Sequence, residues 1–105
     1  MKHNFPKNIM IYGQKTPIKF IKDLEKYYNR DGQYCTDSKI IELDTALLNN
    51  PYLLLKFLHE SYHGVWHRLG WHNAIEDQAE EMIIEGLAKF TFETFDLEFK
   101  NGRRD

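Results

Sequence analysis

The residues with the clearest chemical potential are His59, Glu60, Ser61, Tyr62 and His63, which form an H-E-x-x-H pattern. On a helix, side chains four residues apart share one face, so both imidazoles can bind the same Zn²⁺ ion. Glu60 is then placed to act as the general base on a water molecule at the metal. The pattern predicts a zinc-dependent hydrolase in which His59 and His63 are ligands.

The segment between Pro51 and Gly70 has the pattern of the helix that must hold these histidines. Pro51 suits a first helical turn, and Gly70 is typical of the position just after a helix. Gly64 is a poor helix former within it, since glycine costs about 1 kcal/mol relative to alanine. His59 and His63 lie well away from the centre of the apolar stripe. That stripe is expected to face the core and consists of Leu54, Phe57, Leu58, Ser61, Val65 and Leu69.

A second helix is predicted from about Ala74 to Phe95, and it offers a third ligand. A catalytic zinc ion uses three protein ligands and keeps a fourth position open. The apolar stripe expected to face the core consists of Ile75, Ala79, Met82, Ile83, Gly86, Leu87 and Phe90. A second stripe mixes acidic and apolar residues: Glu81, Glu85, Ala88 and Phe92. The candidate third ligands are Glu76, Glu80, Glu81 and Glu85, with His72 in the preceding turn as an alternative.

His67 continues the face of the helix that carries the histidine pair. At 1.5 Å rise per residue, it lies about 12 Å along the axis from His59. One ion therefore cannot bind His59, His63 and His67 on a straight helix. We expect His67 to have a surface or hydrogen-bonded role instead.

The N-terminal half has the period of β-strands rather than helices. Gly13 and the pair Asp31-Gly32 are turn signals between the apolar runs. The strands are expected at 8–12, 16–21, 33–36 and 39–43, while 22–28 suits either a strand or a helical turn. The fold class predicted for residues 1–105 is therefore α+β, a single domain with a small, mainly antiparallel sheet and two long helices.

Composition limits the partners that this chain can have. The net charge of −2 and the pI near 6.2 argue against a protein that neutralises many phosphates, so no nucleic-acid partner is expected. Cys35 is the single cysteine and cannot form an internal disulfide. The N-terminus lacks the apolar segment of a signal peptide, and no run is long enough to cross a membrane. A cytoplasmic protein without a membrane partner is expected.

Two motifs together resemble the small, often phage- or prophage-encoded zinc metallopeptidases with a minimal gluzincin core, related to the ImmA/IrrE group. The first is the apolar run 55–58 followed by H-E-x-x-H, and the second is the E-x-x-A pattern from Glu85 to Ala88. The resemblance implies a zincin-like fold, a Zn²⁺ cofactor and a protein or peptide substrate. It implies His59, His63 and Glu85 as zinc ligands and Glu60 as general base. The 22-residue step from His63 to Glu85 fits two antiparallel helices.

Two other interpretations remain open from the sequence. In the first, His59, His63 and Glu85, with His72 as a candidate fourth ligand, close a non-catalytic zinc site or metal sensor. In the second, the chain is a metal-free phage adaptor or regulator and the motif is a coincidence. Glu81 and Glu76 rank behind Glu85 as the third ligand. The identity of the substrate, the oxyanion donor and the oligomeric state do not follow from the pattern.

Overall fold

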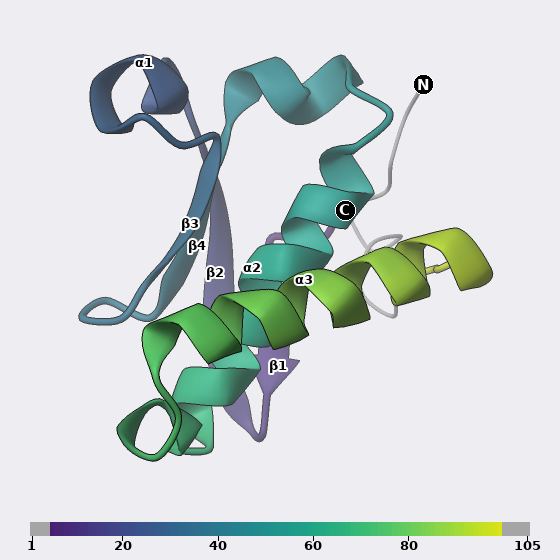
Figure 1. Cartoon of the computed structure of the whole chain (residues 1–105). Helices are drawn as coiled ribbons and strands as arrows, with labels where there is room; N and C mark the ends of the chain where they lie inside the picture. Colours follow the sequence, from purple (N-terminus) through teal and green to yellow (C-terminus); the bar gives the residue numbers. More distant parts are fainter. Residues whose placement is uncertain (1–4, 100–105) are drawn as a thin grey trace.

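The computed structural model describes residues 5–99, which form a four-stranded sheet and two long helices (Figure 1). The predicted α+β class is confirmed. The strands are β1 (Asn8–Ile11), β2 (Gln14–Ile21), β3 (Gly32–Cys35) and β4 (Ile40–Asp44). Their order in the sheet is β1-β2-β4-β3. The β1–β2 and β3–β4 pairs are antiparallel and the β2–β4 pair is parallel. Because β3 stands at the end of the strand order, it is an edge strand.

The turns between the strands follow from a few residues that adopt positive φ. Tyr12 and Gly13 join β1 to β2 with φ angles of 49° and 83°. Two consecutive positive φ values suit the right-handed twist of a two-residue hairpin. The ambiguous segment between β2 and β3 forms a short helix, α1 (Leu24–Tyr28). This connection carries the chain across the sheet, which allows β4 to pair with β2 in parallel.

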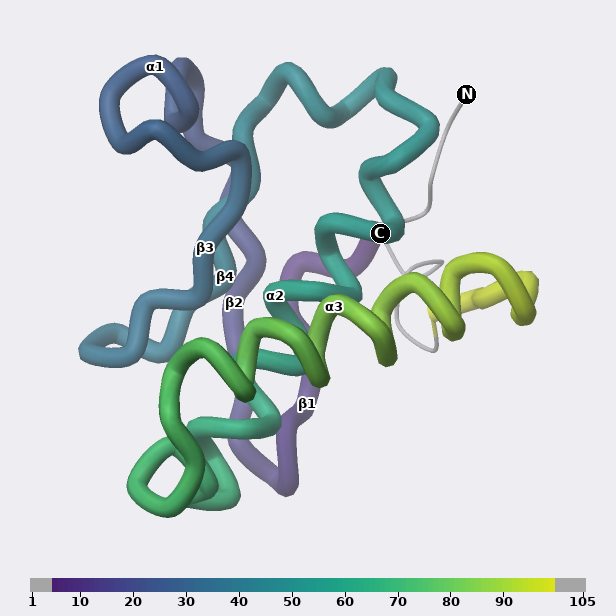
Figure 2. Tube along the Cα trace, in the orientation of Figure 1, coloured from purple at the N-terminus to yellow at the C-terminus, as the bar shows by residue number. Residues whose placement is uncertain are grey.

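Helix α2 (Leu53–Arg68) lies between the sheet and the second long helix (Figure 2). It follows a 3-10 helix, η1 (Thr45–Asn49), which Asp44 caps by accepting a hydrogen bond of 2.9 Å from the Ala46 N–H. Because α2 is covered on two sides, the predicted single stripe is only partly right. Phe57 and Leu58 are buried as expected, but Leu69 is exposed, and the buried set also includes Leu53, Glu60, Gly64 and Trp66.

Gly64 permits the close approach of α2 to the sheet. A Cβ atom at this position would lie 2.8 Å from Ile11 Cδ1 and 3.1 Å from a ring carbon of Tyr34. Both distances are shorter than ordinary van der Waals contacts. The cost of glycine within the helix is therefore offset by packing that a larger side chain would prevent.

Helix α3 (Asp77–Thr94) packs on the side of α2 that faces away from the sheet (Figure 1). A short 3-10 helix, η2 (Trp71–Asn73), precedes it. The apolar stripe predicted to face the core is wrong, because most of its members are exposed, among them Met82 at 70% and Leu87 at 45%. The buried residues of α3 are Glu80, Ile84 and Ala88. Two carboxylates of α3 are thereby brought to the surface of α2 that carries the histidines.

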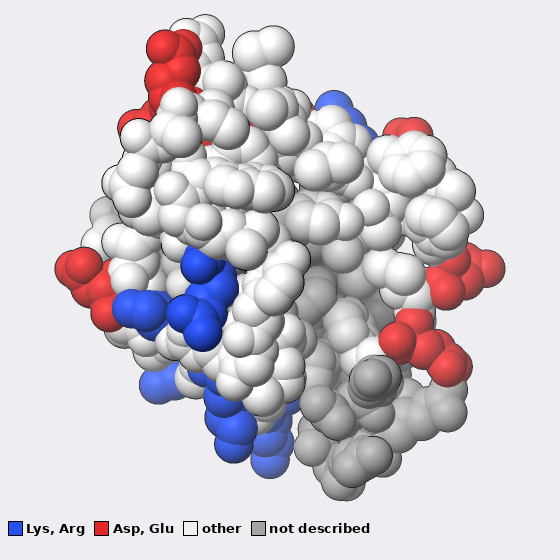
Figure 3. Space-filling model, turned by 90° about the horizontal axis from the view of Figure 1, so that it is seen from below, with Lys and Arg blue, Asp and Glu red and all other residues white. Residues whose placement is uncertain are grey.

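The hydrophobic core fills the space between the sheet and the start of α2. Its buried members are Ile18, Ile41, Leu43, Leu47, Leu53 and Phe57. Within residues 5–99, no helix is both long enough and apolar enough to cross a membrane. On the face seen from below in Figure 3, lysine and arginine side chains gather in one region while acidic side chains lie toward the edges.

Candidate metal site

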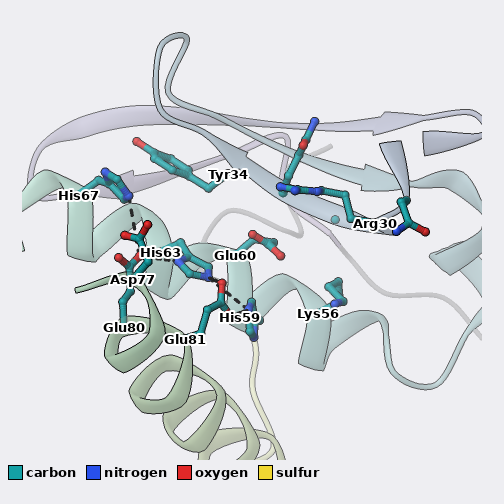
Figure 4. Close-up of a pocket in the computed structure, with 13 residues that line it drawn as sticks. Arg30, Tyr34, Lys56, His59, Glu60, His63, His67, Asp77, Glu80 and Glu81 are labelled. Atoms are coloured by element: carbon teal, nitrogen blue, oxygen red, sulfur yellow. Dashed lines mark hydrogen bonds and ion pairs between the residues drawn. The ribbon is translucent and has the colours of Figure 1, made fainter. Parts of the chain in front are cut away.

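Potential ligand atoms of three residues converge where α2 meets the first turns of α3. The Nε2 atoms of His59 and His63 are 3.2 Å apart. The Glu81 carboxylate places Oε1 at 3.3 Å from His59 Nε2 and Oε2 at 3.1 Å from His63 Nε2. Figure 4 shows these side chains pointing toward one another from the two helices. Within residues 5–99, they are the one group of three such side chains whose ligand atoms lie close enough to share an ion.

The spacing of these atoms fits a tetrahedral zinc ion. Ligands about 2.0–2.1 Å from a tetrahedral metal are separated from one another by about 3.3–3.4 Å. The two Nε2 atoms are 3.2 Å apart, and each lies 3.1–3.3 Å from a different oxygen of the Glu81 carboxylate. Two imidazole nitrogens with lone pairs repel at such a distance unless a proton or a cation lies between them. Two neutral imidazoles and one carboxylate are also a usual donor set for zinc, so the residues fit this ion.

Glu80 fixes the orientation of His63 from the other side of its ring. His63 Nδ1 lies 2.7 Å from Glu80 Oε2. Because a carboxylate accepts hydrogen bonds, Nδ1–H donates and the lone pair of Nε2 is left for a metal. The Glu80 side chain is 6% exposed, whereas that of Glu81 is 58% exposed. Adjacent acids on α3 therefore bind opposite nitrogens of the same histidine.

Glu85, the third ligand implied by the family resemblance, is not brought into this cluster. Its carboxylate forms an ion pair of 3.3 Å with Lys89, one turn further along α3, and both side chains are more than half exposed. It lines a neighbouring cavity of about 280 Å³ that also touches His59. Glu76 precedes α3 as its N-cap residue and is exposed. Among the acids considered from the sequence, the geometry favours Glu81 as the third ligand.

The cluster opens into a cleft of about 600 Å³ between α2, α3 and the edge strand β3. Glu60 lines this cleft although it is only 6% exposed. Burial raises the pKa of Glu60 to about 7, and the nearby charges of His63 and Lys56 act in the opposite direction. In Figure 4 its carboxylate points toward the space between α2 and the sheet. Glu60 therefore lines the same cleft as His59, His63 and Glu81 but is not one of the clustered ligands.

His67 lines one end of the cleft and contacts His72. His67 and His72 stack with ring centroids 4.3 Å apart, and His67 Nε2 is 3.8 Å from Glu80 Oε2. Burial, followed by the charge of His72, lowers the pKa of His67. Burial, followed by the charge of His63, likewise lowers the pKa of His59. His67 thus packs against His72 and lies within ion-pair distance of Glu80, and His72 contacts His67 rather than the ligand residues.

Sequence patterns alone did not identify two features of this site. The inward position of Glu80 depends on the rotation of α3 about its axis, which the apolar residues of that helix predict wrongly. Arg30 and Lys56 also line the cleft, from the segment before β3 and from α2. The i, i+4 and i+8 row of Glu80, Ile84 and Ala88 was the available signal for the buried face.

No protein-family model matches the chain, and neither a curated protein nor a solved structure matches it. The resemblance to the ImmA/IrrE group therefore stays a prediction from two short motifs.

Proposed function

We propose that this protein is a zinc-dependent peptidase whose ligands are His59, His63 and Glu81 and whose general base is Glu60. The observation that carries the proposal is the triangle of His59, His63 and Glu81, whose facing nitrogen and oxygen atoms are 3.1–3.3 Å apart, at the wall of an open cleft. A structural zinc site is closed by four protein ligands, whereas a catalytic site keeps one position free. Three ligands facing a cleft favour the catalytic alternative. The cytoplasmic location expected from the sequence belongs to the same proposal.

The residues around the triangle have distinct roles in peptide hydrolysis. When bound, zinc would polarise the peptide carbonyl and make water a better nucleophile. Glu60 removes a proton from the attacking water, whose oxygen bonds to the carbonyl carbon. The C–N bond then breaks, and Glu60 returns the proton to the leaving amine. Glu80 holds the His63 ring in the orientation that binding requires.

The edge strand β3 supports an extended peptide as the substrate. Gly32, Gln33 and Tyr34 of this strand line the cleft, and in the described sheet β3 is paired on one side only, with β4. An unpaired strand edge can bind an extended chain through backbone hydrogen bonds. A peptide held there lies between β3 and the residues of α2 that carry the proposed chemistry.

Metal analysis combined with a cleavage assay tests the proposal. Protein purified without added zinc and without a histidine tag is expected to contain about one zinc ion per chain. The Glu60→Gln variant should keep this zinc and lose hydrolysis of a peptide mixture by about 100-fold or more. Glu93→Gln, an exposed change on α3 outside the cleft, is the matched control.

The outcomes separate the two parts of the proposal. Absence of zinc at stoichiometric amounts would show that the site does not bind this metal tightly. Full hydrolysis by Glu60→Gln would leave the metal site intact and exclude Glu60 as the base.

A further inference from the structure

The charges that line the cleft are unevenly distributed. Its acidic residues outside α2 are Asp77, Glu80 and Glu81, all from α3. Its two permanent cations are Arg30 and Lys56. Figure 4 shows Arg30 on the sheet side of the cleft and Lys56 toward one end, while His67, Asp77 and Glu80 lie toward the other end. A negatively charged group entering the cleft is attracted to the end with the cations.

Lys56 is held in place, so its charge is partly compensated. Its ammonium group lies 3.1 Å from Asp31 Oδ1, and both side chains are about one-third exposed. A Cβ atom on Gly32 would lie 3.0 Å from the Cγ and Cδ atoms of Lys56. The aliphatic part of Lys56 therefore packs closely on the start of β3, and its charged end is directed to the cleft rim with Asp31.

Arg30 is the cation that retains free binding capacity. Within residues 5–99 its guanidinium has no ion pair, and the residue is exposed. It precedes β3 by two positions, so it lies at the end of the strand along which an extended peptide would pair. A guanidinium has several N–H donors in a planar arrangement that matches the two oxygens of a carboxylate.

We propose that Arg30, supported by Lys56, binds a carboxylate of the substrate and so makes this protein selective for peptides with a negative charge near the cleaved bond. The selectivity rests on the proposed peptidase function, but the binding of a carboxylate can be measured without catalysis. The same chemistry is offered by a glutamate or aspartate side chain and by a free C-terminus. Placement of Arg30 beside the edge strand limits the carboxylate to the residues that pair with β3 or follow them directly.

A set of matched peptides tests this inference. An alanine- and serine-rich peptide, blocked at both ends, carries one glutamate that is moved through each position in turn. A second set has glutamine in its place, and a third has glutamine and a free C-terminal carboxylate. Binding is measured with zinc-loaded Glu60→Gln protein, and cleavage with the zinc-loaded wild type. We expect about a 10- to 100-fold preference for one carboxylate position over its glutamine counterpart.

Variants at two cations identify the source of the preference. Arg30→Gln in either background should remove the preference, and Arg30→Lys should restore part of it because the charge is kept. Lys22→Gln removes an equal charge from an exposed lysine outside the cleft and should leave the preference unchanged. The third peptide set shows whether a side chain or the chain terminus supplies the carboxylate.

Each result bears on the inference separately from the peptidase function. A carboxylate preference that depends on Arg30, without any cleavage, supports the binding site and contradicts the peptidase function. Cleavage without such a preference overturns the inference and keeps the function. Equal slowing of all peptides by Arg30→Gln would assign this residue to the reaction itself and also overturn it. Neither binding nor cleavage of any peptide would overturn both.

Discussion

Helices α2 and α3 meet at the same site but are packed in different ways. α2 lies between the sheet and α3, and its buried residues are spread over more than one face. α3 packs mainly on α2 and buries only Glu80, Ile84 and Ala88. Both helices supply side chains to the cleft and each buries an acid, Glu60 on α2 and Glu80 on α3, but large apolar side chains are exposed on α3.

The difference shows that polar contacts between two helices can override the usual relation between polarity and burial. An apolar stripe normally identifies the face of a helix that packs on the core. On α3, the face that packs on α2 includes the acid Glu80, whose carboxylate contacts His63. The apolar stripe thus predicts the orientation of α3 wrongly and that of α2 only in part.

The largest effect expected is the loss of zinc on removal of a ligand from α3. Glu81→Gln should abolish stoichiometric zinc in the purified protein, because an amide is a weaker ligand than a carboxylate and leaves two histidines to hold the ion. Glu85→Gln should retain it, since Glu85 pairs with Lys89 outside the triangle. Metal analysis of both variants decides between them. The opposite result would restore Glu85 as the ligand and show that α3 is rotated from the orientation described.

Substitution on the two faces of α3 tests its packing directly. Ile84 is fully buried, so Ile84→Ala should reduce the free energy of unfolding by about 2–5 kcal/mol. Leu87 is 45% exposed, and Leu87→Ala should change the free energy of unfolding by less than about 1 kcal/mol. Urea unfolding of the two variants gives the comparison. Similar losses for both would mean that the exposed row is covered in solution.

The buried acid of α2 should make stability depend on pH in chelator-treated protein. Glu60 has a pKa of about 7 in the folded chain against an ordinary value of 4.5. The folded state therefore binds the Glu60 proton more tightly than the unfolded state does. The contribution of this proton to the free energy of unfolding is present at low pH and is lost as the pH rises through about 7. The loss is at most about 3 kcal/mol.

Glu60→Gln should remove this dependence and gain stability relative to the wild type as the pH rises from 5 to 8. His59 and His67 titrate in both proteins and have lowered pKa values, which give the opposite slope, so the difference between the proteins isolates Glu60. Parallel stability curves for the two proteins over this range would contradict the raised pKa.

A smaller effect is expected at the buried acid of α3. Glu80→Gln preserves shape but lets the side chain present an amide to His63 Nδ1 in place of a carboxylate, so zinc affinity should fall by about 10- to 100-fold. Competition with a zinc-binding dye measures this fall, and Glu93→Gln serves as the control on the exposed face. An unchanged affinity would reduce Glu80 to a packing residue.

The elements were predictable because local signals and tertiary packing agree in most of the chain. The hairpin before and after Gly13, the strands around Tyr34 and Ile41 and the helix that carries His59 all form where the period indicates. The parallel pairing of β2 with β4 was not predictable, because it depends on the crossover through α1 and β3.

At the site, the histidine pair and Glu60 were placed by spacing along one helix. The acid of α3 that joins them could not be predicted in this way, since it depends on how α3 is rotated against α2. A difference of four residues, from Glu81 to Glu85, moves a side chain one turn, or about 5–6 Å, along the axis while keeping it on nearly the same face. Periodicity alone therefore cannot separate the two, and the interhelical contact decides.

Glu80 and Glu81 are consecutive, yet they bind the two nitrogens of one imidazole. Both contacts to His63 depend on how α3 is rotated about its axis. The length of the connection through η2 is therefore as important for the site as the side chains themselves. Insertion of one residue within the first turn of α3 turns every later position by about 100° and brings neither acid to its former place. The turn between β3 and β4 has no such constraint. Natural variation in chain length is thus expected to be tolerated at the tip of the sheet and excluded between the two helices.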